Sequence, residues 1–101
     1  MVISDEIKSV IEGSSFVCLV TVNADGTPHP IVTGKGEVAG DTVVFGIYKM
    51  DATQKNLAAN NGLSVVAATK DGAPKGYRLT GTAEVKDKQL IFTPAKAEAL
   101  I

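Results

Sequence analysis

The segment from Lys49 to Asn56 holds the side chains best suited to binding a ligand. A strand pattern runs there directly into a helix pattern, and Thr53 and Gln54 lie in the first helical turn. Helix N-termini present free N–H groups and a partial positive charge, so they bind phosphate groups. The hydroxyl and the amide would add neutral donors, and Lys49 and Lys55 on either side would add positive charge.

Asp51 supports a simpler interpretation of the same segment. The run Asp51-Ala52-Thr53-Gln54 fits a capping box, with Asp51 as the N-cap and Gln54 three residues later. A carboxylate at that position would occupy the free N–H groups and repel an anion. The residues alone therefore leave two interpretations open, an ordinary capped helix and a phosphate site.

His29 and Cys18 are the only histidine and the only cysteine of the chain. His29 lies between two prolines, and no Asp, Ser or Cys lies at a spacing that would indicate acid–base catalysis. We therefore expect His29 to be a half-exposed residue at a strand end. Cys18 lies in the middle of the most apolar segment, and we expect it to be buried and inert. The sequence thus offers no convincing catalytic residue and no zinc ligand set.

The run Gly34-Lys35-Gly36 interrupts a predicted strand. Such glycines mark either a bulge or sharp bend in a small barrel, or a place where a flat ligand lies close to the backbone. The glycine spacing matches no dinucleotide-binding or Walker loop.

Hydrophobic periodicity predicts the elements that would position these residues. Apolar residues at helical spacing indicate a helix that follows Ser4 as N-cap and stops at Gly13, and a second helix runs from Asp51 to Asn60. Strands are expected near residues 16–22, 28–33, 43–48, 63–69 and 77–85, with turns at Asp25-Gly26, Gly40-Asp41 and Asp71-Gly72. In the tail, Leu90 to Phe92 suggest a short sixth strand, and Thr93-Pro94 with the alanine-rich run after it suggests the start of a helix.

These elements predict a mostly β, α+β fold with about six antiparallel strands, closed or nearly closed into a barrel. Pro28 and Pro30 place their strand at an edge or a bulge. The strands at 16–22 and 63–69 are apolar on both faces, so each must be covered twice. Because two short helices supply little cover, a second subunit is expected, and the chain is predicted to be a homodimer.

Composition excludes several classes of function. The 101 residues suit one domain, 1–101, and 10 basic against 11 acidic residues leave a net charge of −1. Nucleic-acid binding is not expected, because it requires a clustered basic face. No run reaches the length of a membrane span, and no signal peptide is recognised. We therefore expect a cytoplasmic protein.

The order of the predicted strands and helices, together with the turn residues between them, resembles that of a known family. The residues that carry the resemblance are Asn23 to Val32, Gly40-Asp41 before Val43-Val44-Phe45, Lys49 with Thr53 to Leu57, Asn60, Val65-Val66, and Tyr77 to Val85. This pattern is similar to that of the FMN-binding split barrels, which include the pyridoxamine 5′-phosphate oxidase-like proteins and small FMN-binding proteins. The similarity covers about residues 3 to 86 and implies an antiparallel split β-barrel.

The resemblance implies a homodimer with two FMN molecules in clefts between the subunits. Val32, Thr33 and Gly34, together with Gly46, Ile47 and Tyr48, would then lie along the isoalloxazine ring and the ribityl chain. The phosphate-binding turn would comprise Lys49, Thr53 and Gln54. Glycine at 34 and 46 suits a planar ring that approaches the backbone.

Two features depart from the family pattern. Many relatives place a basic residue at the start of the helix that leads to the Asn-Leu pair, where this chain has Ala52 and Thr53. Many relatives also continue into a further strand beyond the position of Ile101.

The leading hypothesis is a dimeric FMN-binding flavoprotein that serves in electron transfer or in flavin-dependent oxidoreduction of a small substrate. Pyridoxamine phosphate oxidation itself is not expected, because Arg78 is the only arginine. The alternative is a flavin-free binding module that retains the barrel and the dimer.

Overall fold

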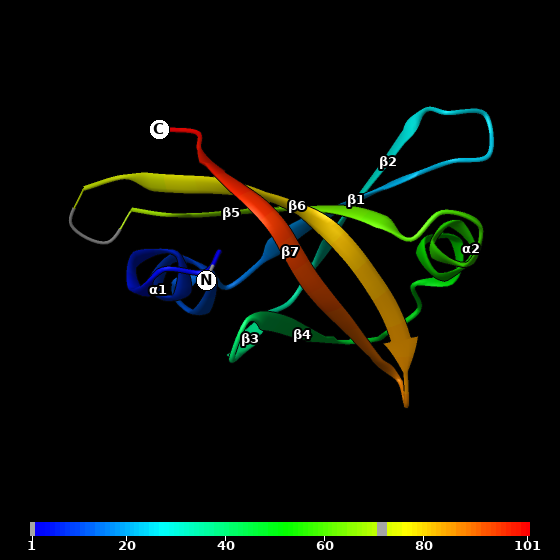
Figure 1. Cartoon of the computed structure of the whole chain (residues 1–101), viewed down its shortest axis with the longest axis horizontal. Coiled ribbons are helices and arrows are strands. Elements are labelled where there is room, and N and C mark those ends of the chain that lie inside the picture. The colour runs from blue at the N-terminus through cyan, green and yellow to red at the C-terminus, as the bar shows by residue number, and fades with distance from the viewer. Residues whose placement is uncertain (1, 71–72) are drawn as a thin grey trace.

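The computed structural model describes residues 2–70 and 73–101, which form seven strands and two helices. In chain order these are α1 Asp5–Gly13, β1 Val17–Val22, β2 Pro28–Thr33, β3 Glu37–Ala39, β4 Thr42–Gly46, α2 Asp51–Ala59, β5 Gly62–Thr69, β6 Lys75–Lys86 and β7 Gln89–Ala99. The strands form one antiparallel sheet in the order β2-β1-β5-β6-β7-β4-β3 (Figure 1). The predicted mostly β, α+β split-barrel class is confirmed, and the short strand β3 is an addition to it. The turn predicted at Asp71-Gly72 lies outside the described residues.

The strand that carries the two prolines lies at an edge of the sheet, as predicted. β2 pairs only with β1 in the described sheet, so that Val20 faces Pro30 and Val22 faces Pro28. An edge strand has one side free of ladder hydrogen bonds, and proline is tolerated there because it has no N–H to donate.

The first helix begins and ends where its sequence predicts. The Ser4 hydroxyl accepts a hydrogen bond from the Ile7 N–H at 3.2 Å, and Ile7, Val10 and Ile11 are buried. At the other end, the Glu12 carboxylate accepts from the Val38 N–H at 3.1 Å, which joins the helix to β3. Figure 1 shows α1 and α2 at opposite ends of the long axis of the molecule.

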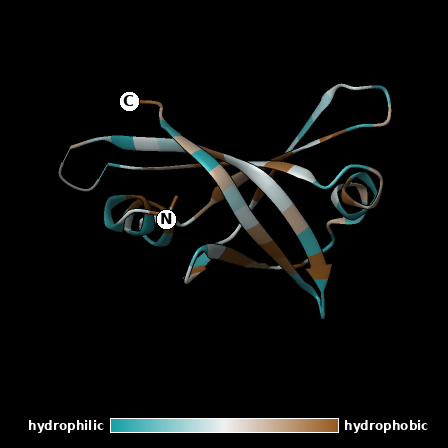
Figure 2. Cartoon of the chain, viewed as in Figure 1, coloured by the Kyte–Doolittle hydropathy of each residue, from teal (hydrophilic) through white to brown (hydrophobic). Residues whose placement is uncertain are grey.

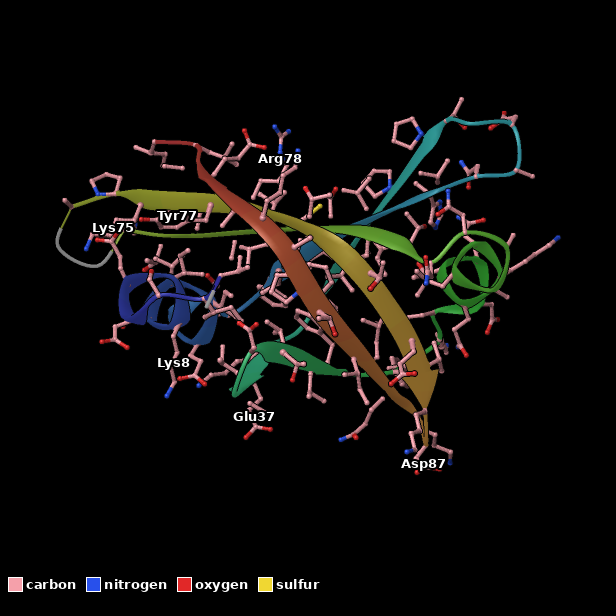
Figure 3. All side chains as sticks on the ribbon, viewed as in Figure 1. Lys8, Glu37, Lys75, Tyr77, Arg78 and Asp87 are labelled. Atoms are coloured by element: carbon pink, nitrogen blue, oxygen red, sulfur yellow. The ribbon has the colours of Figure 1, made fainter. Side chains whose placement is uncertain are left out.

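A polar cluster on the surface joins α1 to β6. The Tyr77 hydroxyl donates to the Glu6 carboxylate, and the Lys75 ammonium lies 3.0 Å from it. Figure 3 shows Lys75 and Tyr77 on β6 above α1. The hydrogen bond from Tyr77 is the main reason why the pKa of Glu6 lies below its ordinary value of 4.5, and Lys75 lowers it further. The same hydrogen bond raises the pKa of Tyr77.

The prediction of a helix after Thr93 is wrong, because β7 continues as a strand to Ala99. Its alanine-rich run favours a helix in isolation, but pairing with β6 overrides that preference. Within this run Ala97 packs against the core, whereas its neighbours Lys96 and Glu98 are exposed, as expected for successive residues of a strand. Directly opposite Glu98, Arg78 forms an ion pair with it at 2.7 Å.

The core is mainly aliphatic, as the composition predicts, but two phenylalanines lie at its centre. Phe45 on β4 and Phe92 on β7 are fully buried. They belong to paired strands, in which Val43 faces Phe92 and Phe45 faces Leu90. Figure 2 shows hydrophobic segments along these strands and hydrophilic residues at the turn between β6 and β7.

Burial in β1 alternates, so Cys18 is only partly buried in a single copy, and the expectation that it fills the core is wrong. Val17, Leu19 and Thr21 face the core, whereas Cys18 and Val20 point outward and are only partly buried. The sequence is apolar on both faces, but one chain covers only one of them. The cover for the outward face is therefore not supplied by the described residues of a single copy.

Neither α1 nor α2 is long and apolar enough to cross a membrane, and these are the helices of the described residues.

Candidate functional site

A groove of about 370 Å³ lies between β2 and the segment that joins β4 to α2. β2 forms one wall, and the first turn of α2 with the residues before it forms the other. The lining residues are His29, Ile31, Val32, Thr33 and Gly34 on the first wall and Tyr48, Lys49, Met50, Asp51, Ala52 and Thr53 on the second. Two segments that are about twenty residues apart in the sequence thus face each other.

The groove brings together most of the residues that the sequence singles out for FMN. Six of the nine line it, namely Val32, Thr33, Gly34, Tyr48, Lys49 and Thr53. The other three lie nearby but outside it. Ile47 packs against the core, Gly46 lines a separate hollow beside Glu12, and Gln54 lines a groove on another side of α2.

Five lining residues are not among those predicted for the site, and His29 is the most informative of them. His29 is half-buried, as expected, but it lies inside the groove. The strand period holds the signal for this, because residues i, i+2 and i+4 share a face. His29 and Ile31 are therefore on the same face of β2 as Thr33, which the sequence does assign to the site.

The first turn of α2 is not capped by Asp51, so the predicted capping box is wrong. The N-cap is Met50, which makes no side-chain hydrogen bond to the helix, and Asp51 is the first helical residue. The Asp51 N–H donates to the Lys49 carbonyl oxygen at 2.9 Å, and the Gln54 N–H donates to the Met50 carbonyl oxygen at 2.8 Å. The N–H groups of Ala52 and Thr53 lack acceptors within the helix, and the N-cap residue supplies no side-chain hydrogen bond to them.

Thr53 carries a buried hydroxyl without a partner. Thr53 is 1% exposed, and among the described residues no group lies within hydrogen-bonding distance and geometry of its Oγ1. A buried polar atom that makes no hydrogen bond costs about 1–3 kcal/mol. Such an atom at a helix N-terminus is what a ligand with acceptor oxygens would satisfy.

Charge and an exposed aromatic ring lie at the mouth of the groove. The Lys49 ammonium is 5.6 Å from the centre of the Tyr48 ring, and Tyr48 is 81% exposed. Lys49 has a left-handed backbone, with φ of 58°. Asp51 lines the same groove, so a cationic and an anionic side chain lie at the helix start.

The two glycines after β2 differ in what surrounds them. A Cβ atom at Gly36 would lie 2.6 Å from Cε1 of Phe45, so the packing of the core requires glycine there. A Cβ atom at Gly34 would meet nothing within 4 Å, although Gly34 lines the groove. Core packing thus explains Gly36, whereas the fold leaves space beside Gly34 that a ligand could occupy.

Metal ligands do not gather at this site or elsewhere in the described chain, since no group of three or more His, Cys, Asp or Glu side chains lies together in it.

The sequence matches the family model of pyridoxamine 5′-phosphate oxidase over residues 3–99. The chain belongs to this family. No curated protein sequence matches it.

Solved structures share the fold of this pyridoxamine 5′-phosphate oxidase family member at low sequence identity. HupZ from Group A Streptococcus superposes with a TM-score of 0.81 at 19% identity, over 96% of this chain and 93% of that one. An FMN-binding protein from Syntrophomonas wolfei superposes with a TM-score of 0.75 at 17% identity, over 93% of this chain and 83% of that one. A heme binding protein from Mycobacterium smegmatis superposes with a TM-score of 0.75 at 15% identity, over 92% of this chain and 51% of that one. The shared property is the split-barrel fold.

Proposed function

We propose that this chain is an FMN-binding flavoprotein, a single domain over residues 1–101 that acts as a homodimer. Its role is electron transfer or flavin-dependent oxidoreduction of a small substrate. The observation that carries the proposal is the buried, unpartnered hydroxyl of Thr53, a residue that lines the groove at the uncapped start of α2. A family neighbour that is named as an FMN-binding protein supports it.

The residues present fit the phosphate of FMN. The Thr53 hydroxyl and the N–H groups of Ala52 and Thr53 would donate to the phosphate oxygens, and Lys49 would add a charge-assisted contact. Gln54, which the sequence assigns to the phosphate, lines a groove on another side of α2 and is left out of the proposal. The Asp51 carboxylate opposes the phosphate, so the affinity depends on Lys49 and on the helix start.

The groove also offers a place for the rest of the cofactor. Val32, Thr33 and Gly34 on one wall and Tyr48 on the other would lie along the ring and the ribityl chain, with Gly46 and Ile47 just beyond. The open space beside Gly34 permits this approach. When bound, FMN supplies the redox chemistry, while the protein orients it and excludes water.

A second copy of the chain is part of the proposal, because the groove is small and open for this ligand. Ligand sites that enclose most of a molecule usually measure about 300–1,000 Å³, and this groove is near the lower limit. The outward face of β1 and β2 is apolar and begins at the groove, with Val32 68% exposed and Phe16 71% exposed. A partner seated on that face would supply a further wall.

The test is a comparison of FMN with riboflavin, which lacks the phosphate. Charge-assisted hydrogen bonds contribute about 1.5–3 kcal/mol each, so FMN should bind at least about tenfold more tightly. Asp51→Asn is the matched control, because removing a carboxylate near the phosphate should leave FMN binding equal or tighter. Equal affinities for FMN and riboflavin in the parent protein would contradict the phosphate site.

A flavin-free binding module is the second candidate, and the charge of the groove favours it. Lys49 is offset by Asp51, and Ala52 stands where many relatives carry a basic residue. The heme binding neighbour shows that the fold accompanies another planar ligand in a different protein. The absorption spectrum of the purified protein separates the candidates: a flavin spectrum supports the first, and a colourless protein that ignores added FMN supports the second.

A further inference from the structure

Helix α2 has little apolar contact to hold it against the sheet. Of its nine residues only Thr53 and Leu57 are buried, and Leu57 is the single large apolar one. The N-cap Met50 is also buried in the core, so one apolar side chain anchors each end of the helix. Two such anchors leave the rotation of the helix about its own axis to polar contacts, and the position of the Thr53 side chain depends on that rotation.

The Asn56 side chain provides such an interaction. Its Nδ2 donates to the Thr21 Oγ1 and to the Asn23 Oδ1, both at 3.0 Å. Thr21 is 0% exposed and faces the core from β1. Because Asn56 lies three residues after Thr53, the two side chains share a face of α2, so a bond that fixes one also fixes the other.

The acceptor of this bond is joined to the opposite wall of the groove. Thr21 on β1 is paired in register with His29 on β2, and His29 lines the groove. β1 thus carries one wall through its ladder with β2 and the other wall through Asn56. The distance between the two walls depends on both connections.

We propose that Asn56 is a positioning residue, which through Thr21 holds the first turn of α2 at the separation from β2 that the phosphate of the ligand requires. This rests on the proposed function for the identity of the ligand. The placement of the helix start can be tested without any ligand.

The experiment compares Asn56→Ala and Thr21→Val with Thr21→Ser, which keeps the hydroxyl. Asn60→Ala is the matched control, since Asn60 Oδ1 accepts from the Gly62 N–H at 3.0 Å, away from the groove. In the ligand-free protein, Asn56→Ala and Thr21→Val should shift the amide NMR resonances of Ala52 and Thr53, and Thr21→Ser and Asn60→Ala should leave them near their parent positions. Thermal melts identify any variant that fails to fold. If Asn56→Ala does not fold, the test rests on Thr21→Val, which keeps the shape of the side chain.

The second readout is the ratio of riboflavin to FMN dissociation constants. Asn56→Ala and Thr21→Val should lower it at least about fivefold, with riboflavin affinity unchanged, while Thr21→Ser retains it. A purely structural role would lower stability and leave this ratio and the first-turn resonances as they were, which would overturn the proposal. If the parent protein itself does not prefer FMN, the proposed function fails, and the ligand-free resonances still decide whether Asn56 positions the helix.

Discussion

The backbone N–H of Asp51 donates to the carbonyl oxygen of Lys49 at 2.9 Å, across Met50. Met50 has φ of −82° and ψ of 49°, so the three residues form an inverse γ-turn. Lys49, the first residue of this turn, has φ of 58°, which lies in the left-handed region that costs a non-glycine residue about 1–2 kcal/mol. The turn that aims the helix start into the groove therefore holds a residue in a strained backbone conformation.

Two substitutions at Lys49 separate the charge from the strain. Lys49→Gly and Lys49→Ala remove the same ammonium group, but only glycine adopts a positive φ without penalty. We expect the free energy of unfolding, measured in urea, to be about 1 kcal/mol higher for Lys49→Gly than for Lys49→Ala. FMN affinity should fall about tenfold in both, since one charge-assisted contact is lost. A Lys49→Gly variant less stable than Lys49→Ala would show that the left-handed backbone carries no strain, because glycine then pays only its larger loss of backbone entropy.

Thr53 should show opposite effects on stability and on binding. Thr53→Val keeps the shape of the side chain and removes a buried hydroxyl without a partner, so the free protein should gain about 1 kcal/mol of stability. The same variant should lose most of its preference for FMN over riboflavin. Thr42→Val is the control, because the Thr42 hydroxyl donates to the Ala39 carbonyl oxygen at 2.8 Å, and its loss should lower stability instead. A destabilised Thr53→Val would mean that the hydroxyl has a partner in solution.

The two glycines after β2 should respond differently to an added methyl group. Gly34→Ala places the methyl in open space, so thermal stability should be close to that of the parent while FMN and riboflavin both bind more weakly. Gly36→Ala places the methyl against the Phe45 ring, so stability should fall by about 1–3 kcal/mol. Calorimetry and flavin fluorescence titration measure the two effects. Unchanged flavin binding in Gly34→Ala would remove this glycine from the site.

Sequence patterns predict the elements best where one periodicity dominates. The spacing of Ile7, Val10 and Ile11 and the cap at Ser4 identify α1, and the alternation of β6 identifies a strand. The same strand period, applied to β2, would group His29 with Thr33. These features depend on local order alone, which is why a sequence reveals them.

Other features depend on contacts between distant segments. The alanine-rich end of β7 becomes a strand because β6 is there to pair with it, and the bulge beside Gly81 fits because a Cβ at that glycine would meet the carbonyl oxygen of Thr93. Asp51 is displaced from the N-cap by the γ-turn at Met50, which no capping rule anticipates. The unpartnered state of the Thr53 hydroxyl is likewise a property of its surroundings in space.

Acid should weaken the contact between α1 and β6. The pKa of Glu6 is lower in the folded protein than its ordinary value of 4.5. The stability that its carboxylate contributes is therefore complete at pH values above 4.5, and it is lost as the pH falls through the lower pKa of the folded protein. Glu6→Gln removes this dependence, so the stability difference between parent and variant should shrink as the pH falls below 4.5. Urea unfolding at a series of pH values measures it. A difference that stays constant across this range would contradict the linkage.

The outward face of β1 and β2 should be the dimer interface. Sedimentation should report a dimer at micromolar concentration, with more than about 1,200 Å² buried, and Val32→Lys should give a monomer because it places a charge on that face. Val85→Lys is the matched control, since Val85 is also exposed but lies on β6 near the turn to β7. Cys18 is the direct neighbour of Val32 across the ladder, so a thiol reagent should label it slowly in the parent and in Val85→Lys, and quickly in Val32→Lys. A parent protein that sediments as a monomer, with Cys18 labelled at once, would leave this face free and the groove without its second wall.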